Sequence, residues 1–152
     1  MISTFFGEHA ESGYQVIPLP MSEPRCPFCN PSHRDIIQQN DLAYVRTDRF
    51  PITRGHLLAI PFRHVASFFD ATPEERSALL DLVVETRVYT DGRHHPDGYN
   101  IGVNIGRYAG QAVMHLHLHI IPRYKGDGKG RTGGMRWVIP RIPPPEGRDW
   151  FG

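Results

Sequence analysis

The sequence lacks the features that would suggest a membrane, secreted or nucleic-acid-binding protein. It has no apolar run near the ~18 residues that a membrane-spanning helix needs. Residues 1–20 lack the basic start and long apolar core of a signal peptide. Its 17 Lys and Arg against 16 Asp and Glu give a net charge of +1, with no block of like charge, so neither duplex nucleic acid nor an anionic membrane is an expected partner. We expect a soluble, cytoplasmic protein that recognises its partners at a specific site.

Cysteine is also scarce, since the chain holds only Cys26 and Cys29, in the stretch Cys-Pro-Phe-Cys. In a reducing compartment such a pair is more naturally half of a metal site, or a redox pair, than a structural disulfide. Whether the pair belongs to a metal site or forms a redox pair depends on the residues that surround it.

A length of 152 residues with 39% hydrophobic content is enough for one ordinary core, so a single domain, residues 1–152, is expected. Residues 1–25 show no sustained period and hold three prolines; they are interpreted as an arm, with one candidate short strand at residues 4–6. Residues 126–152 are rich in glycine and proline and form a tail.

Between arm and tail, the hydrophobic pattern predicts two strands, one long helix and two further strands. Thr72, Pro73 and Glu75 have the spacing of a capping box at the start of the helix, and Gly92 is a plausible end. This order predicts an α+β domain, an antiparallel sheet with a helix on one face. The predicted elements are strands at 42–47, 56–61, 99–105 and 114–122 and a helix within 70–93.

What the sequence has in unusual measure is histidine, with three of its nine histidines at 115, 117 and 119. On a strand these side chains share one face while Leu116, Leu118 and Ile120 take the other, so the imidazoles should face a groove or solvent. One metal ion cannot take all three, because Cα atoms four residues apart on a strand are separated by roughly 13 Å. A merely polar sheet face is possible, but three histidines in alternation make it the weaker reading.

A chain of phosphates suits such a row better. Neutral imidazole is abundant at pH 7 and can attack phosphorus, and the central histidine, His117, is the natural nucleophile. The preceding loop, residues 104–112, adds the side-chain amides of Asn104 and Gln111 and the flexible Gly110, which together suit phosphate oxygens. Taken alone, a glycine-containing loop is a weak signal.

The histidine row and the residues before it resemble the histidine triad (HIT) family, whose motif His-φ-His-φ-His-φ-φ (φ, apolar) is matched by residues 115–121. The similarity extends back through residues 109–111, Asn104 and residues 55–64 to residues 26–29. It implies a HIT core over 26–124, with about five strands, followed by a tail at 125–152. The family also implies a homodimer.

The resemblance implies roles for several residues. His117 would attack the α-phosphate of an adenine nucleotide conjugate to form a nucleotidyl-histidine that water hydrolyses, and His119 would hold the phosphate and leaving group. The nucleotide-binding positions would be Asp48 on the ribose, Leu58 on the base, Asn104 and Gln111 near the phosphates, and His56 beneath the triad. For three of them a purely structural reading exists: Asp48 as a turn residue, His56 and Leu58 as core.

Zinc-containing members of the family imply a use for the cysteine pair. Their metal would be held here by Cys26, Cys29, His64 and His115, a closed structural site that removes His115 from catalysis. His33 is a competing ligand, and a reduced pair without metal is the alternative.

The resemblance implies a nucleotidyl hydrolase or transferase, with dinucleoside polyphosphates as the first expected substrates. Nucleoside phosphoramidates are the runner-up, and a phosphorylase that uses phosphate in place of water is a third variant. A zinc-stabilised nucleotide-binding module without activity is the alternative from another class. One departure concerns Ala112, where many members have a serine or threonine that donates to phosphate.

Overall fold

The computed structural model describes residues 26–128 and 132–137. The expected arm at 1–25, with its candidate strand at 4–6, and most of the tail lie outside the described residues. None of the helices in the described part of the chain is long and apolar enough to span a membrane.

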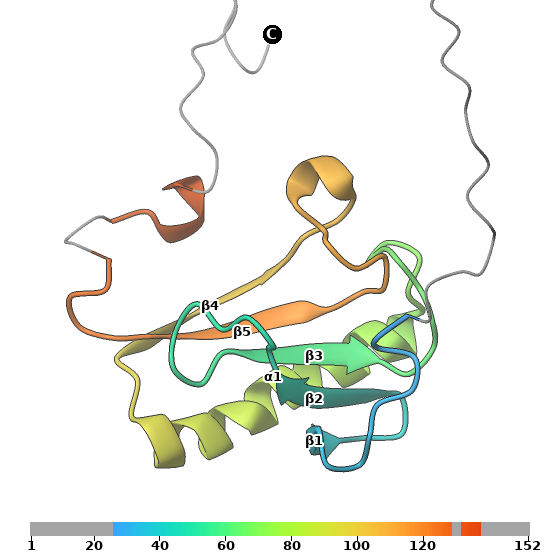
Figure 1. Ribbon diagram of the computed structural model, residues 1–152, viewed down its shortest axis with the longest axis horizontal. Coiled ribbons are helices and arrows are strands. Elements are labelled where there is room, and N and C mark those ends of the chain that lie inside the picture. Colours follow the sequence, from blue (N-terminus) through green and yellow to red (C-terminus); the bar gives the residue numbers. More distant parts are fainter. Residues whose placement is uncertain (1–25, 129–131, 138–152) are drawn as a thin grey trace, which may run out of the picture.

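The structure confirms the α+β fold (Figure 1). Five strands form one sheet in which every neighbouring pair is antiparallel. One long helix, α1 (Pro73–His94), covers a face of the sheet, and two short 3₁₀ helices are η1 (Arg107–Ala109) and η2 (Gly134–Trp137). In spatial order the strands are β1 (Ile36–Gln39), β2 (Ala43–Thr47), β3 (Leu57–Pro61), β5 (Leu118–Arg123) and β4 (Gly98–Val103).

The edge strand β1 was not predicted. It has four residues, Ile-Ile-Gln-Gln, without alternation, and its register with β2 shifts between Ile36 and Gln38. So short a strand gives no period that could be recognised in the sequence.

The strand predicted at 114–122 begins only at Leu118. Before it, the backbone N–H of Leu116 donates to the carbonyl of Val65, 2.6 Å away in the segment that follows β3. The first two histidines of the triad therefore lie on the approach to β5, the non-strand segment that precedes it, rather than in its ladder.

The start of α1 is as predicted, and its end is not. The Thr72 hydroxyl accepts from the Glu75 N–H, and the Glu75 carboxylate accepts from the Thr72 N–H, which completes the capping box. The helix runs through Gly92 to His94, and the left-handed residue at its end is His95, with φ of 50°. A glycine in a last turn costs only about 1 kcal/mol, so it does not have to end a helix.

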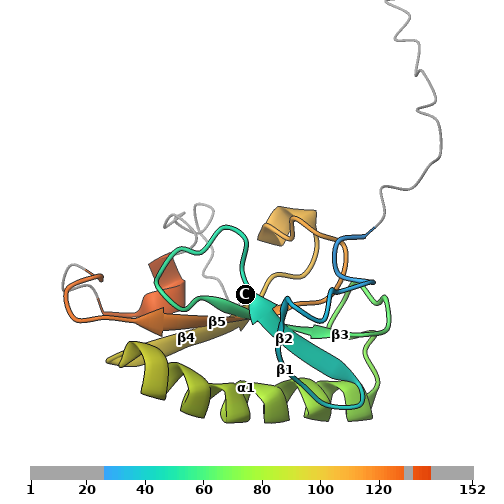
Figure 2. The ribbon, with the colours of Figure 1, turned by 60° about the horizontal axis from the view of Figure 1, so that its bottom comes forward.

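The two faces of the sheet pack against different parts of the chain. The face toward α1 holds the main core, including Val45, Leu57, Leu118 and Ile120 with Leu79 and Leu82 of the helix. The opposite face carries Tyr44, Leu58 and Ile60 against Phe28 of the N-terminal loop. Figure 2 shows α1 on one side of the sheet and the connecting loops on the other.

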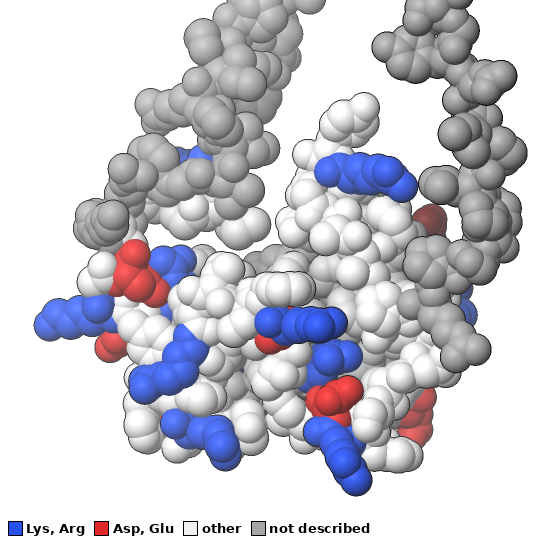
Figure 3. All heavy atoms as spheres, in the orientation of Figure 1, with Lys and Arg blue, Asp and Glu red and all other residues white. Residues whose placement is uncertain are grey.

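Charge is mixed over the surface in Figure 3, where basic side chains lie in separate groups with acidic ones between them. This distribution agrees with the sequence, which offers no block of like charge for a polyanion to follow.

Candidate functional site

Four potential metal ligands from three separated segments meet beside β3. Cys26 and Cys29 come from the loop before β1, His64 from the segment after β3, and His115 from the approach to β5. Their ligand atoms all lie within 4.8 Å of one another. His33, the competing ligand, is exposed and is not part of this group.

The distances in this cluster fit a tetrahedral ion. Cys26 Sγ lies 3.3 Å from His115 Nδ1, Cys29 Sγ lies 3.2 Å from His64 Nδ1, and Cys29 Sγ lies 3.7 Å from His115 Nδ1. Zinc bonds of ~2.3 Å to sulfur and ~2.1 Å to nitrogen, at tetrahedral angles, place sulfur and nitrogen about 3.6 Å apart. The four residues present therefore fit zinc without rearrangement of the fold.

The protons of His115 also fit a ligand. Its Nε2 lies 2.9 Å from the carbonyl of Pro61, and a carbonyl only accepts, so Nε2 carries the proton and the Nδ1 lone pair points toward the sulfurs. Burial lowers the pKa of His115, which keeps the ring neutral. A metal-ligating histidine commonly donates its second N–H to a backbone carbonyl in this way.

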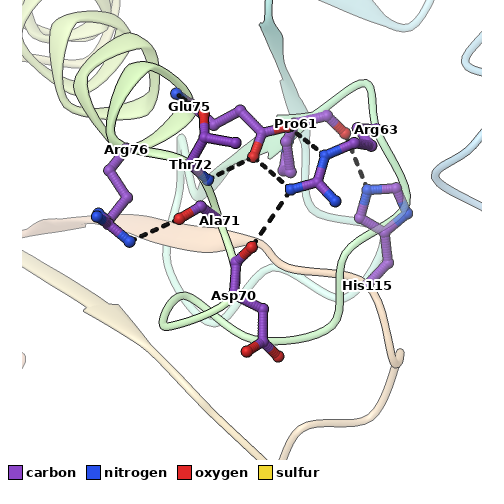
Figure 4. A network of polar contacts seen from close by, with 8 residues as sticks. All are labelled: Pro61, Arg63, Asp70, Ala71, Thr72, Glu75, Arg76 and His115. Carbon is purple, nitrogen blue, oxygen red and sulfur yellow. Dashed lines mark hydrogen bonds and ion pairs between the residues drawn. The ribbon is translucent and has the colours of Figure 1, made fainter.

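The segment that carries His64 is tied to the start of α1 (Figure 4). The guanidinium of Arg63 donates to both carboxylate oxygens of Glu75, at 2.7 Å each, and to the carbonyl of Asp70. Glu75 is the same residue that closes the capping box with Thr72. The residue before His64 is therefore anchored to the helix, while Pro61 at the end of β3 bonds His115.

His117, the predicted nucleophile, has a defined tautomer. Its Nδ1 lies 2.8 Å from the carbonyl of His115, so Nδ1 carries the proton and Nε2 keeps its lone pair. The ring also makes edge contacts with Phe28 and His119, at centroid distances of 5.3 and 5.0 Å. Orientation of His117 thus depends on the backbone of the residue that faces the cysteines.

His56 and His119 form a second pair whose protons can be assigned. The backbone N–H of Ile52 donates to His56 Nδ1, so the proton of His56 lies on Nε2 and is donated to His119 Nδ1, 3.0 Å away. His119 then carries its own proton on Nε2. That nitrogen is buried and has no hydrogen-bond partner among the described residues.

Burial, and then the neighbouring His117 and His56, lower the pKa of His119 to about 4. Both histidines of the pair are neutral at pH 7, since burial also lowers the pKa of His56. An unpaired buried donor costs about 1–3 kcal/mol, and an anionic oxygen of a ligand would remove this cost.

Asp48 completes a second group of possible metal ligands with His56 and His119, and its Oδ2 lies 3.5 and 3.9 Å from their facing nitrogens. Here the protons do not fit a metal. The Nε2 of His56 carries a hydrogen that fills the gap, and moving it to Nδ1 would break the bond from Ile52. Proximity is similar in the two groups, but only the cysteine group directs lone pairs inward.

A pocket of about 400 Å³ opens on this face of the sheet. His117 and His119 line it, and so do Asp48 and Leu58, two of the predicted nucleotide contacts. His56 is buried and is not among the residues that line it. The exposed Ala112 lies on the rim, at the position where a hydroxyl was noted as absent.

Asn104 and Gln111 bracket the loop that contains η1. Gln111 is buried, its carbonyl oxygen accepts from the Gly106 N–H at 2.7 Å, and its amide donates to the Ala66 carbonyl at 2.8 Å. The Gln111 amide therefore holds the loop closed, and neither Gln111 nor Asn104 is among the residues that line the pocket. Asn104 is half-buried just beyond the end of β4.

One expectation about the triad was wrong. The three imidazoles do not all face a groove or solvent, because His115 is completely buried, in edge contact with the rings of Phe28 and His64. The cysteine loop covers this end of the row, which alternation alone does not show.

Sequence reasoning also missed Phe28 and Arg46, which line the pocket. Phe28 stands inside the Cys-Pro-Phe-Cys stretch, and Arg46 lies in the strand predicted at 42–47, two residues before Asp48. Both positions were therefore available as signals.

Comparison with known proteins identifies relatives of this chain. The chain is 32% identical over 110 residues to AP-4-A phosphorylase from Mycobacterium tuberculosis, with 70% of this chain and 56% of that protein covered. It thus spans just over half the length of that relative. It is 36% identical over 112 residues to Protein hit from Bacillus subtilis, covering 69% of this chain and 76% of the relative.

Among solved structures, a Zn-bound histidine triad family protein from Mycobacterium smegmatis matches with a TM-score of 0.61 and 33% identity, covering 68% of this chain and 78% of that one. Diadenosine triphosphate hydrolase from Plasmodium falciparum matches with a TM-score of 0.61 and 25% identity, covering 64% and 66%. The HIT domain model matches residues 30–126, nearly two thirds of the chain. The protein belongs to the HIT domain family.

Proposed function

We propose that the protein is a nucleotidyl hydrolase or transferase that cleaves nucleotide conjugates at the α-phosphate through a nucleotidyl-histidine on His117. One observation carries the proposal: the lone pair of His117 Nε2 and the N–H of His119, which has no partner among the described residues, belong to adjacent rings that line one pocket. A nucleophile and a donor for the phosphoryl oxygens are the two groups that the reaction needs.

In the first step, the His117 Nε2 lone pair attacks the α-phosphorus, an N–P bond forms, and the P–O bond to the leaving phosphate chain breaks with its electrons. His119 Nε2–H donates to a non-bridging oxygen. The hydrogen bond that His117 Nδ1–H donates to the carbonyl of His115 stabilises the positive charge that develops on the ring. Water then attacks phosphorus, the N–P bond breaks, and the nucleotide leaves with one proton released.

Dinucleoside polyphosphates are the first substrates to test, because two similar proteins are named for activity on diadenosine compounds. The name AP-4-A phosphorylase also favours the variant in which inorganic phosphate replaces water. Nucleoside phosphoramidates use the same nucleophile and are the remaining alternative.

Asp48 supports a ribose contact, since its carboxylate lies on the pocket beside the phosphate-facing histidines and can accept from two hydroxyls. Leu58 supports a base contact from the floor of the pocket. Asn104 and Gln111 are proposed for the phosphate end on the family resemblance, since neither lines the pocket.

The experiment is turnover of diadenosine tetraphosphate and of an adenosine phosphoramidate, with and without added phosphate. His117→Ala should lower turnover at least about a thousandfold. His33→Ala, a histidine variant at an exposed position outside the pocket, is the matched control and should keep the parent rate. Absence of turnover with every substrate contradicts the enzyme and favours a nucleotide-binding module, and equal rates for His117→Ala and the parent contradict His117 as the nucleophile.

Zinc is proposed at the cysteine cluster on the geometry and protonation described above. When bound, it would supply a structural link between the N-terminal loop and the approach to β5, with no open position for chemistry. The cytoplasm, the expected location, is a reducing compartment and would keep both thiols available to bind zinc.

A homodimer is proposed through β4, an edge of the sheet. Between this strand and α1 lies a groove of about 580 Å³ that includes the exposed Ile101 and Val84. A second copy could pair with the strand edge and cover both side chains. Light scattering should give twice the chain mass for the parent and a monomer for Ile101→Glu; a monomeric parent contradicts the proposal.

A further inference from the structure

The nucleotide pocket has a basic end in addition to its histidine end. Its walls near Leu58 are apolar, formed by Pro27, Phe28 and Val113, and Arg46 also lines it. Arg46 has a side chain only 19% exposed, so the guanidinium is largely enclosed by the site rather than spread in solvent.

The register of the sheet gives the order of these residues. Arg46 on β2 is opposite Leu58 on β3, and Leu58 is opposite His119 on β5. Strands lie ~4.8 Å apart, so the backbones of Arg46 and His119 stand roughly 10 Å from each other, with Leu58 between them. This separation is comparable with that between the α-phosphate and the far edge of a base, so a nucleotide held by His119 and lying over Leu58 would present its base edge to Arg46.

The donors of Arg46 are largely unused within the part of the chain that the structure describes. Its one ion-pair contact among the described residues is with Asp35, at 3.9 Å, which is too long for a hydrogen bond. A guanidinium carries five N–H donors in a planar fork that matches two neighbouring acceptors.

The ligand group that Arg46 meets is better described as a neutral base edge than as an extra phosphate. Asp48 follows just past the end of β2 and lines the pocket, and Asp35 pairs with Arg46, so an added anion at Arg46 would meet two carboxylates; Arg49, the other arginine of the pocket, is exposed. Apolar walls suit the flat faces of a base. Guanine offers the acceptors O6 and N7 side by side, whereas adenine places an amino donor beside N7.

We propose that Arg46 reads the base edge and makes the site prefer guanine nucleotides over adenine nucleotides. The inference rests on the proposed nucleotidyl-transfer function for its substrate and deepens it. In the bound state the guanidinium fork donates to O6 and N7 while the base lies over Leu58.

The test compares kcat/KM for diguanosine and diadenosine tetraphosphate, and in parallel the affinities of GMP and AMP. The parent should favour guanine by about tenfold or more in both measurements, the low end of what one bidentate contact gives. Arg46→Leu should bring both ratios to about one, with continued binding of AMP as the check that the pocket has folded. Arg34→Leu, a change at an exposed arginine in the turn before β1, outside this pocket and outside the β4–α1 groove, is the matched control and should keep both ratios.

The two proposals fail separately. Equal ratios in the parent, a preference for adenine, or a guanine preference that survives Arg46→Leu each overturn the role of Arg46 while leaving hydrolysis intact. If neither dinucleotide is cleaved but GMP binds more tightly than AMP and Arg46→Leu removes the difference, the role of Arg46 stands and the enzyme proposal fails.

Discussion

Two clusters of ligand-type side chains stand on the same face of the sheet and differ in where their protons lie. In the cluster of Cys26, Cys29, His64 and His115, the His115 proton points outward to the Pro61 carbonyl. In the cluster of Asp48, His56 and His119, a proton lies between the two rings. Closeness of ligand atoms is therefore not sufficient for a metal site. The backbone partners of each imidazole decide whether a lone pair or a hydrogen faces the centre.

His117 lies between the clusters and depends on both, through the His115 carbonyl and through its contact with His119. The largest expected effect is accordingly the loss of turnover in His117→Ala, described above. His119→Ala should lower kcat about 10²–10³-fold, as removal of one donor to a developing anion does. Steady-state kinetics checks the ranking, and a larger loss from His119→Ala than from His117→Ala would reverse the assigned roles.

Removal of a cysteine ligand should mainly affect stability. A metal present at about 1,000 times its Kd contributes about 4 kcal/mol, which corresponds to a Tm shift of roughly 10 °C in a domain of this size. Cys29→Ser should lose the metal and most of this increment. Calorimetry with and without a chelator measures it, and a chelator that leaves the Tm of the parent unchanged contradicts a structural metal.

The histidine cluster should instead respond to acid. Burial lowers the pKa of His119 to about 4, below the ~6.5 of an unfolded histidine. Between these values the unfolded chain binds more protons, so the stability that the neutral ring contributes is present above pH 6.5 and is lost as pH falls toward 4. The expected loss from this group between pH 7 and pH 5 is about 2 kcal/mol.

Urea unfolding at the two pH values measures this loss. His119→Gln should lose about 2 kcal/mol less than the parent over the same range, because glutamine does not titrate. Acid release of a metal affects both proteins alike, since both keep the cysteine cluster. Equal losses in parent and variant would show that His119 titrates normally in the folded state.

The smallest expected effect comes from the helix cap, which is linked to the cysteine cluster but not to the histidine cluster. Thr72→Ala removes the hydroxyl that accepts from Glu75 and should cost about 1 kcal/mol. Because Glu75 also holds Arg63 beside His64, metal affinity should fall slightly while the pH response of His119 stays the same. Metal competition with a chromogenic chelator checks the first point, and a changed pH response would contradict the second.

Much of the core, the start of the helix and the cysteine cluster could be predicted from the sequence, because the patterns that indicate them involve residues close together in the chain. Alternation places Leu116, Leu118 and Ile120 in the core, and the Thr72–Glu75 spacing predicts the helix start. The four cysteine-cluster residues were implied by family resemblance, and the structure brings them together.

The remaining features depend on contacts between distant segments. The burial of His115 depends on the Phe28 loop, and its tautomer on Pro61, 54 residues away. The proton between His56 and His119 depends on the Ile52 N–H in a turn that the pattern only outlines. No local period encodes such partners.

Metal content per chain, measured on protein purified without added metal, tests the distinction between the clusters most directly. The parent and His56→Gln should each hold one zinc, and His64→Ala should hold much less. Two metal ions per parent chain, or loss of zinc in His56→Gln with retention in His64→Ala, would contradict it.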